Sequence, residues 1–163
     1  MTKLIQNLRE NVPGAENALL EYTETHYFND NEQLELISFL KFDKLKDAVK
    51  NILLKCARKN MLCTKAHEEL ANLLKDTNCK DAAKEILLAC LEGWGIWTEG
   101  LVVLVNLLEN TDCHVATDAK KILLSQVEKW FIGGRALSQL IMQENKGVKA
   151  ASEVLKCCHN LYL

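Results

Sequence analysis

An internal repeat with a period near 34 residues runs through this chain and limits the folds that are open to it. Residues 70–79 and 104–113 are identical at six of ten positions, and two further positions exchange Asp and Asn. The same apolar pattern occurs at 36–40, one period earlier, and in a weaker form at 137–141, at an offset of 33 residues. Units of this kind bury their apolar faces by stacking on their neighbours.

A second element repeats in step with the first. Residues 49–54 and 83–88 share the pattern Lys-x-Ile-Leu-Leu at an offset of 34. The pattern occurs again at 119–124, 36 residues later, and in a looser form at 15–20 and 151–155. Because two different elements alternate at one period, each repeat consists of a pair of elements.

Both elements have the apolar spacing of amphipathic helices. Leu70, Leu73 and Leu74 lie at i, i+3 and i+4, which places them on one face of a helix. No strand-like alternation persists anywhere in the chain. We therefore expect ten helices, near residues 2–11, 14–28, 31–42, 44–59, 64–76, 80–92, 98–109, 116–131, 135–144 and 147–161.

The predicted fold is all-α: a right-handed α-α superhelix, or solenoid, of about four helix hairpins with a capping helix at each end. A length of 163 residues is typical of a single domain, here spanning 1–163. The hairpins are expected at 14–42, 44–76, 80–109 and 116–144, with caps at 2–11 and 147–161. The expected core includes Leu73, Leu74, Ile86, Leu87, Leu107, Leu108, Ile122 and Leu123.

The C-terminal half also follows the order of a known repeat. An apolar helix at 104–108 leads into a polar turn that holds Asp112, followed by Val115 and, four residues later, by Ala119. This order resembles HEAT and armadillo repeats, over about residues 31–163 and less clearly over 1–30. The resemblance implies hairpins whose second helices line a concave face. Tetratricopeptide repeats are the alternative, since their period is 34 residues, but their Trp, Tyr and terminal Pro are absent here.

The chain has seven cysteines and four histidines, which raises the question of a metal site. Cys56, Cys90 and Cys158 occupy the same repeat position, so they are expected to lie about 10 Å apart in stacked helices. Zinc–sulfur bonds are about 2.3 Å long, so these cysteines cannot share one ion. We expect them to be small core residues, and we expect no metal and no cofactor.

No catalytic motif is present. The chain has no glycine-rich phosphate loop and no Gly-x-Ser-x-Gly. His67 and Glu68 match the start of His-Glu-x-x-His, but position 71 is Ala71. We therefore expect that the protein is not an enzyme. A small α-helical enzyme with an unrecognised site, such as a cysteine–histidine dyad from distant residues, is the alternative.

Residues 41–65 are locally basic, with eight Lys or Arg and only two Asp. This segment could bind nucleic acid, a phosphate or an acidic peptide, or it could be an ordinary solvated helix face. The whole chain has a net charge of −2, which is unlike a strongly basic nucleic-acid binder. A nucleic-acid-binding solenoid is therefore an alternative function only.

Two sets of residues are candidates for binding a partner protein. The resemblance to HEAT repeats places one set in the concave groove, where lysines predominate and favour an acidic partner segment: Lys50, Lys55, Lys84, Lys120 and Lys121. The second set follows the Lys-x-Ile-Leu-Leu helices, maps to one edge of the stack, and is either a binding surface or a cover for the ends of the core: Trp94, Trp97, Trp130 and Phe131.

The remaining sequence features favour an intracellular protein. The first ten residues contain no apolar segment of the kind found in secretory signals, and the odd cysteine count argues against a secreted disulfide framework. The most apolar run, 101–108, is too short to span a bilayer. We expect a cytoplasmic protein, with the nucleus possible and no membrane partner. The expected function is a non-enzymatic scaffold or adaptor that binds another protein.

Overall fold

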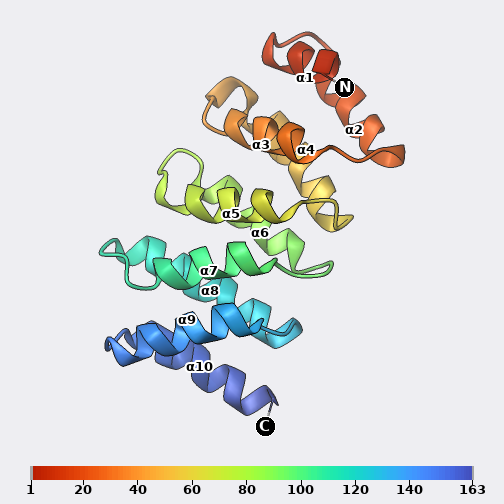
Figure 1. The fold of residues 1–163 in the computed structure, drawn as a ribbon. Helices are drawn as coiled ribbons and strands as arrows, with labels where there is room; N and C mark the ends of the chain where they lie inside the picture. Colours follow the sequence, from red (N-terminus) through yellow and green to blue (C-terminus); the bar gives the residue numbers. More distant parts are fainter. Residues whose placement is uncertain (1, 163) are drawn as a thin grey trace.

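The structure is a computed structural model that describes residues 2–162, and this part of the chain contains ten α-helices, one turn of 3-10 helix and no strand (Figure 1). The ten expected helices are confirmed, with ends that differ by a few residues from those expected. They are α1 (Thr2–Arg9), α2 (Ala15–Thr25), α3 (Asp30–Phe39), α4 (Asp43–Arg58), α5 (Thr64–Asn72), α6 (Lys80–Cys90), α7 (Thr98–Leu107), α8 (Cys113–Lys129), α9 (Gly134–Asn145) and α10 (Lys149–Tyr162).

Side chains next to the helix ends set several of these boundaries. Helix α3 begins at a capping box, in which Glu32 N–H donates to Asn29 Oδ1 and Asn29 N–H donates to Glu32 Oε2. Helix α8 begins three residues earlier than expected, because Asp112 caps it by accepting from His114 N–H at 2.9 Å. The end of α5 tightens into the 3-10 turn Leu73–Lys75.

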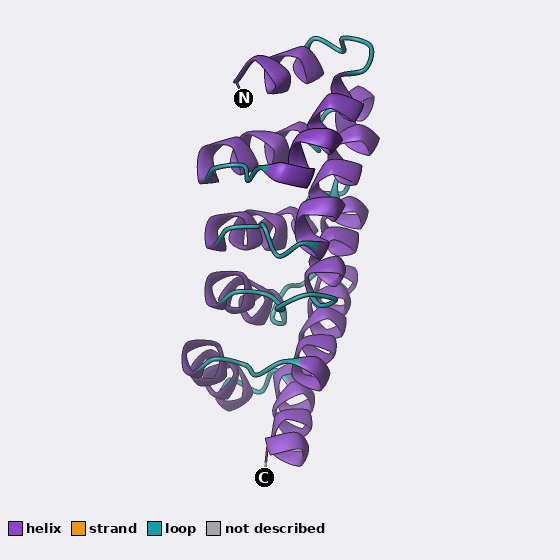
Figure 2. Cartoon of the chain, turned by 90° about the vertical axis from the view of Figure 1, so that its right-hand side faces the viewer, coloured by secondary structure: helices purple, strands orange, loops and turns teal. Residues whose placement is uncertain are grey.

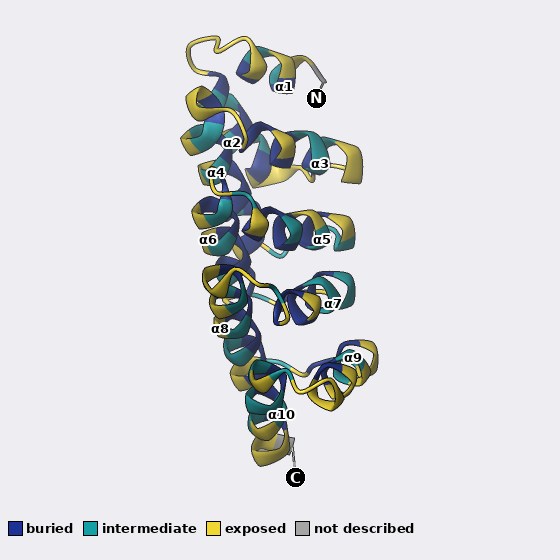
Figure 3. Ribbon diagram, turned by 90° about the vertical axis from the view of Figure 1, so that its left-hand side faces the viewer, coloured by how far each residue is buried: buried dark blue, intermediate teal, exposed yellow. Residues whose placement is uncertain are grey.

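The helices form two rows, which Figures 2 and 3 show edge on. Helices α1, α3, α5, α7 and α9 contact one another in succession and form the odd row. Helices α2, α4, α6, α8 and α10 do the same and form the even row. Each helix of the odd row also contacts the next helix along the chain, which gives five successive hairpins from α1–α2 to α9–α10.

This grouping begins one helix earlier than the ranges expected from the sequence, 14–42, 44–76, 80–109 and 116–144. Helices α1 and α10 each belong to a hairpin, where the sequence analysis treated them as separate caps. The connections within hairpins are three to five residues long and those between hairpins are four to seven, so their lengths overlap. Length alone therefore does not reveal which connection joins the helices that pack against each other, although the connections between hairpins carry more aromatic residues.

The core lies between the two rows. All eight residues expected in it are buried, from Leu73 to Leu123. A single cluster of buried apolar side chains extends from Ile5 in α1 to Cys158 in α10. Stacking therefore joins the apolar faces of the five hairpins into one core.

The structure also corrects the repeat register in α9. Helices α7 and α9 begin 36 residues apart, so Leu140 takes the position of Leu104, and both are fully buried. The offset of 33 would instead equate Leu108, which is buried, with Ile141, which is 46% exposed. A pattern spaced at i, i+3 and i+4 overlaps itself when it is shifted by three residues, so a short apolar motif does not define its own register.

Candidate partner-binding surfaces

The loops that lead from the even row back to the odd row all lie along one edge of the molecule (Figure 1). These loops are residues 26–29, 59–63, 91–97 and 130–133. We call this edge the loop edge. It carries Trp94, Trp97, Trp130 and Phe131, so the structure brings the four predicted aromatic residues to two neighbouring loops.

These aromatic side chains differ in exposure. Trp94, Trp97 and Phe131 are 69%, 50% and 66% exposed, respectively. Trp130 is half-buried, and its indole N–H donates to the Leu91 carbonyl of the preceding loop at 3.3 Å. Trp130 therefore joins two loops, whereas Trp94 and Trp97 present large apolar surfaces to solvent.

The loop that carries the two exposed tryptophans is held from both sides. Trp94 N–H donates to Asn60 Oδ1 of the preceding loop at 2.6 Å. Ile96 N–H donates to Gln126 Oε1 of α8 at 2.9 Å, and Trp97 N–H approaches His67 Nδ1 of α5 at 3.4 Å. The backbone of residues 94–97 is therefore ordered before any partner arrives, which lowers the entropy cost of binding.

Gly95 is required for this loop conformation. Its φ is +83°, in the left-handed region that glycine adopts most readily. A Cβ at this position would lie 3.0 Å from the Gln126 amide and from Trp130 Cγ. Any side chain here would push the loop away from α8.

Two buried amides, which were not expected from the sequence, hold the loop edge together. Gln33 of α3 donates to the carbonyls of Phe28 and Met61, both at 2.9 Å, and accepts from Cys63 N–H at 2.8 Å. It thus fastens two successive loops, as Gln126 does further along. The sequence feature that could have predicted them is a glutamine among the apolar positions of a helix, because an amide buried there needs hydrogen-bond partners.

His67 is buried where α5 and α7 make their closest approach. A Cβ on Gly100 of α7 would lie 2.9 Å from His67 Cβ, so only glycine permits this spacing. Burial lowers the pKa of His67 to about 4. The imidazole is therefore neutral at pH 7, as its role as acceptor for Trp97 N–H requires.

A hollow of about 520 Å³ opens beside Trp97 on the loop edge. It is lined by Trp97 and Cys63 and by charged residues of both signs, including Lys65, Glu68 and Glu99. The edge therefore combines exposed aromatic rings with a concave surface next to them that carries charges of both signs.

The predicted groove lysines lie on the even row, and most of them form ion pairs within the chain. Lys50 of α4 pairs with Glu85 of α6 at 3.1 Å. Lys84 of α6 pairs with Asp118 of α8, and Lys120 of α8 pairs with Glu153 of α10. Each pair joins one helix of the even row to the next, so these residues form a ladder of ion pairs.

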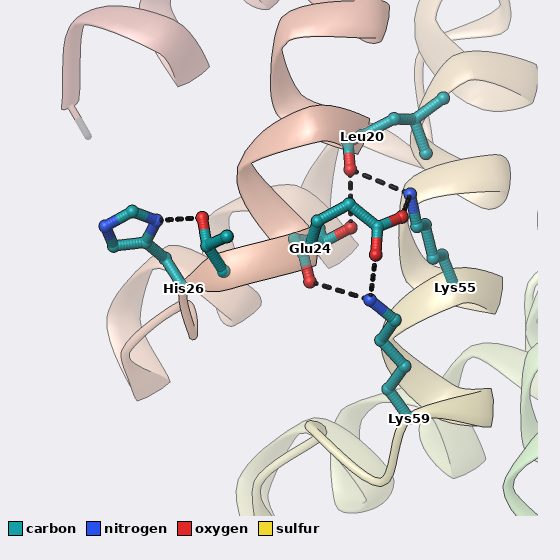
Figure 4. A network of polar contacts seen from close by, with 7 residues as sticks. Leu20, Glu24, His26, Lys55 and Lys59 are labelled. Atoms are coloured by element: carbon teal, nitrogen blue, oxygen red, sulfur yellow. Dashed lines mark hydrogen bonds and ion pairs between the residues drawn. The ribbon is translucent and has the colours of Figure 1, made fainter.

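The first step of this ladder is a small network between α2 and α4 (Figure 4). Lys55 and Lys59 both pair with Glu24, and they donate to the Leu20 and Thr23 carbonyls near the C-terminal end of α2. Hydrogen bonds from the two lysines lower the pKa of Glu24 to about 2. Glu24 therefore stays ionised well into the acidic range.

Four of the five predicted groove lysines thus form ion pairs within the chain, and Lys55 shares its partner Glu24 with Lys59. Lys121 is exposed and has no ion-pair partner among the described residues. The basic segment 41–65 also has much of its positive charge paired within the chain. Five of its eight basic side chains form ion pairs: Lys46 with Asp43, Lys50 with Glu85, Arg58 with Glu92, and Lys55 and Lys59 with Glu24.

The cysteines that share a repeat position are core residues. Burial raises the pKa of the Cys56 and Cys90 thiols to about 12, so both remain protonated at neutral pH. Within residues 2–162, no three His, Cys, Asp or Glu side chains are grouped so that they could hold a metal ion. No helix in the described part of the chain is both long enough and apolar enough to cross a membrane.

The fold defines an all-helical protein whose described residues form ten helices in two rows, without a sheet. Comparisons with protein-family models, with curated protein sequences and with solved structures find no match.

Proposed function

We propose that this protein is a non-enzymatic interaction module, a scaffold or adaptor built as an α-solenoid of the HEAT or armadillo type, and that it binds its partner protein through the loop edge. The observation that carries the proposal is the pair Trp94 and Trp97, each at least half exposed on a loop that three hydrogen bonds hold in place. The function rests on this surface, because many functions share one fold.

Exposed tryptophans on an ordered loop have the properties of an interface anchor. Each Trp can bury about 150–250 Å² of surface, and Trp is among the residues that contribute most to binding free energy. Since the backbone of residues 94–97 is already hydrogen-bonded, little loop ordering remains to oppose association. The hollow beside Trp97 offers space for a partner side chain next to the ring.

The ladder of ion pairs makes an acidic partner a weaker proposal than the lysines alone suggest. An acidic segment would have to compete with Glu85, Asp118 and Glu153, which already neutralise Lys50, Lys84 and Lys120. Lys121 is the one groove lysine still available in the described chain. We therefore propose the acidic segment as a secondary contact that guides association and contributes less to affinity.

The experiment is affinity capture from cell extract on the immobilised full chain, with and without nuclease and high salt. We expect Trp94→Ala with Trp97→Ala to lose the proteins that the wild type retains, with unchanged circular dichroism and Tm. Phe42→Ala is the matched control, because Phe42 is an aromatic residue of similar exposure, 58%, outside the loop edge. Retention that survives the tryptophan changes would refute the proposal.

A second arm tests the lysines. Charge reversal of Lys50, Lys84 and Lys120 should leave most of the capture intact and should lower Tm, because each new glutamate faces an acidic side chain of the next helix. Loss of capture in the triple variant alone, with the tryptophan variant unaffected, would move the binding site to the even row. Capture that depends on nucleic acid would be abolished by nuclease and by salt.

A further inference from the structure

The two end faces of the stack differ in polarity. Helix α1 buries Ile5 and Leu8 against the next hairpin, and Lys3 and Gln6 are exposed on it. Arg9 is also exposed but turns to Glu35 of α3, at 2.6 Å. The exposed surface of α1 is therefore polar. The opposite face is formed by α9 and α10 on the side turned away from α7 and α8 (Figure 3). Apolar side chains line a hollow on this face.

The apolar character of this face follows from the repeat. Leu137 and Ile141 in α9 take the positions of Leu101 and Val105 in α7, and Leu155 in α10 takes the position of Leu123 in α8. In the α7–α8 hairpin these residues are at most 2% exposed, because α9 and α10 cover them. In the α9–α10 hairpin, Ile141 is 46% exposed, and no described element covers it.

A hollow of about 420 Å³ runs along this face. Leu137, Ile141, Leu155 and Cys158 supply apolar walls, and Phe131 lies at the same hollow with 66% of its surface exposed. Glu144 and His159 also line the hollow. We call this surface the terminal face. Phe131, which the sequence places with the loop-edge aromatics, therefore borders a second surface as well.

We propose that the terminal face is a self-association surface and that its occupant is the terminal face of a second copy of this chain. A head-to-tail arrangement would press the polar face of α1 into the apolar hollow, which leaves charged side chains without water or partners. A two-fold arrangement pairs the terminal face with itself and buries the apolar residues of both copies.

The terminal face has the features that a self-complementary interface needs. It carries a hollow whose lining includes two large, exposed apolar side chains, Phe131 and Ile141, which a second copy of the same surface can cover. It also carries an acidic and a basic group, Glu144 and His159, which can pair across a two-fold axis. Its apolar centre is typical of homodimer interfaces.

Sedimentation velocity on the full chain tests this directly. We expect wild-type protein to sediment with twice the 18.4 kDa chain mass at concentrations of about 1–100 µM, the range in which many specific interfaces form. Ile141→Glu should weaken association by about 100-fold or more, because it places a carboxylate from each copy in an apolar interface. Ile141 is nearly half exposed, so circular dichroism should show that the variant still folds.

Val12→Glu is the matched control, since Val12 is an apolar residue of similar exposure, 41%, at the other end of the stack. It should leave the dimer unchanged.

Hydrogen exchange should show protection of residues 137–144 and 154–159 that rises with protein concentration. A wild type that remains monomeric throughout, or an Ile141→Glu variant that remains dimeric, would overturn the proposal, as would loss of the dimer in the control. The tryptophan variants of the loop edge should dimerise normally, which separates this test from that of the proposed function.

Discussion

The α7–α8 and α9–α10 hairpins carry the same repeat pattern, but the pattern has different consequences in them. Leu123 in α8 is fully buried, whereas Leu155, at the same position in α10, is only half-buried. Leu107 in α7 corresponds to Gln143 in α9, which is also fully buried although its side chain is polar. An apolar position in a stacked repeat is therefore a core position only when another hairpin covers it, and a covered position is not always apolar.

The largest expected effect tests this comparison directly. Leu123→Ala should lower the free energy of unfolding by about 2–5 kcal/mol, because it leaves a cavity in a fully packed site. Leu155→Ala should cost clearly less, since its surroundings are partly open. Denaturant midpoints check the difference when both variants are measured at a protein concentration low enough for the monomer, because a dimer would cover Leu155. Equal losses would show that the two hairpins are covered alike.

The second prediction concerns α5, where His67 stands at the position of Leu101 in α7. Its pKa is lowered by burial from 6.5 to about 4, so the unfolded chain takes up a proton at a higher pH than the folded chain does. This contribution to stability is complete above pH 6.5 and is lost as the pH falls towards 4. The loss is about 3 kcal/mol, at roughly 1.4 kcal/mol for each pKa unit.

Thermal unfolding between pH 7 and pH 4 measures this loss. His67→Leu should remove most of the pH dependence in that interval, whatever it does to stability at pH 7. Because protonation would also remove the acceptor of Trp97 N–H, we expect hydrogen exchange at Trp97 to increase over the same pH range. If Tm of His67→Leu depends on pH as the wild type does, His67 is not the group whose protonation lowers the stability.

The third prediction uses the buried glutamines. Both polar atoms of the Gln143 side chain are buried and have no hydrogen-bond partner among the described residues. Gln143→Leu should therefore stabilise the fold by about 1–3 kcal/mol, because it removes an unsatisfied amide and restores the residue type found in α7. Gln126→Leu is the matched control and should destabilise, since Gln126 Oε1 accepts from Ile96 N–H. If both variants change the free energy of unfolding in the same direction, this account is contradicted.

The smallest expected effect lies in the ion-pair ladder. Lys84→Glu should lower Tm slightly, because it faces Asp118 across the even row. Adding Asp118→Lys should recover most of the loss by restoring a pair of opposite charges. Surface pairs contribute about 0–1 kcal/mol each, so the shifts should also shrink in high salt. A double variant no more stable than the single one would show that the two residues do not interact.

The sequence by itself determined the local structure and the repeat. Helix positions followed from the apolar spacing, and the eight expected core residues are buried because each belongs to the apolar pattern of a helix or of the turn that ends it. The aromatic residues could be assigned to the loops after the Lys-x-Ile-Leu-Leu helices, because the offsets between repeats are visible in the chain. These are properties of near neighbours in sequence, and they depend on helix geometry alone.

Only the tertiary structure decided which surfaces remain available. The sequence could not show that Lys84 pairs with Asp118 or that Trp97 N–H donates to His67, because the partners are 34 and 30 residues apart and meet through the stacking of hairpins. The same holds for Ile141, which belongs to the apolar pattern but lies exposed at the end of the stack. Pairing and burial depend on which hairpin packs against which, and a repeated pattern is equally compatible with a covered and an uncovered face.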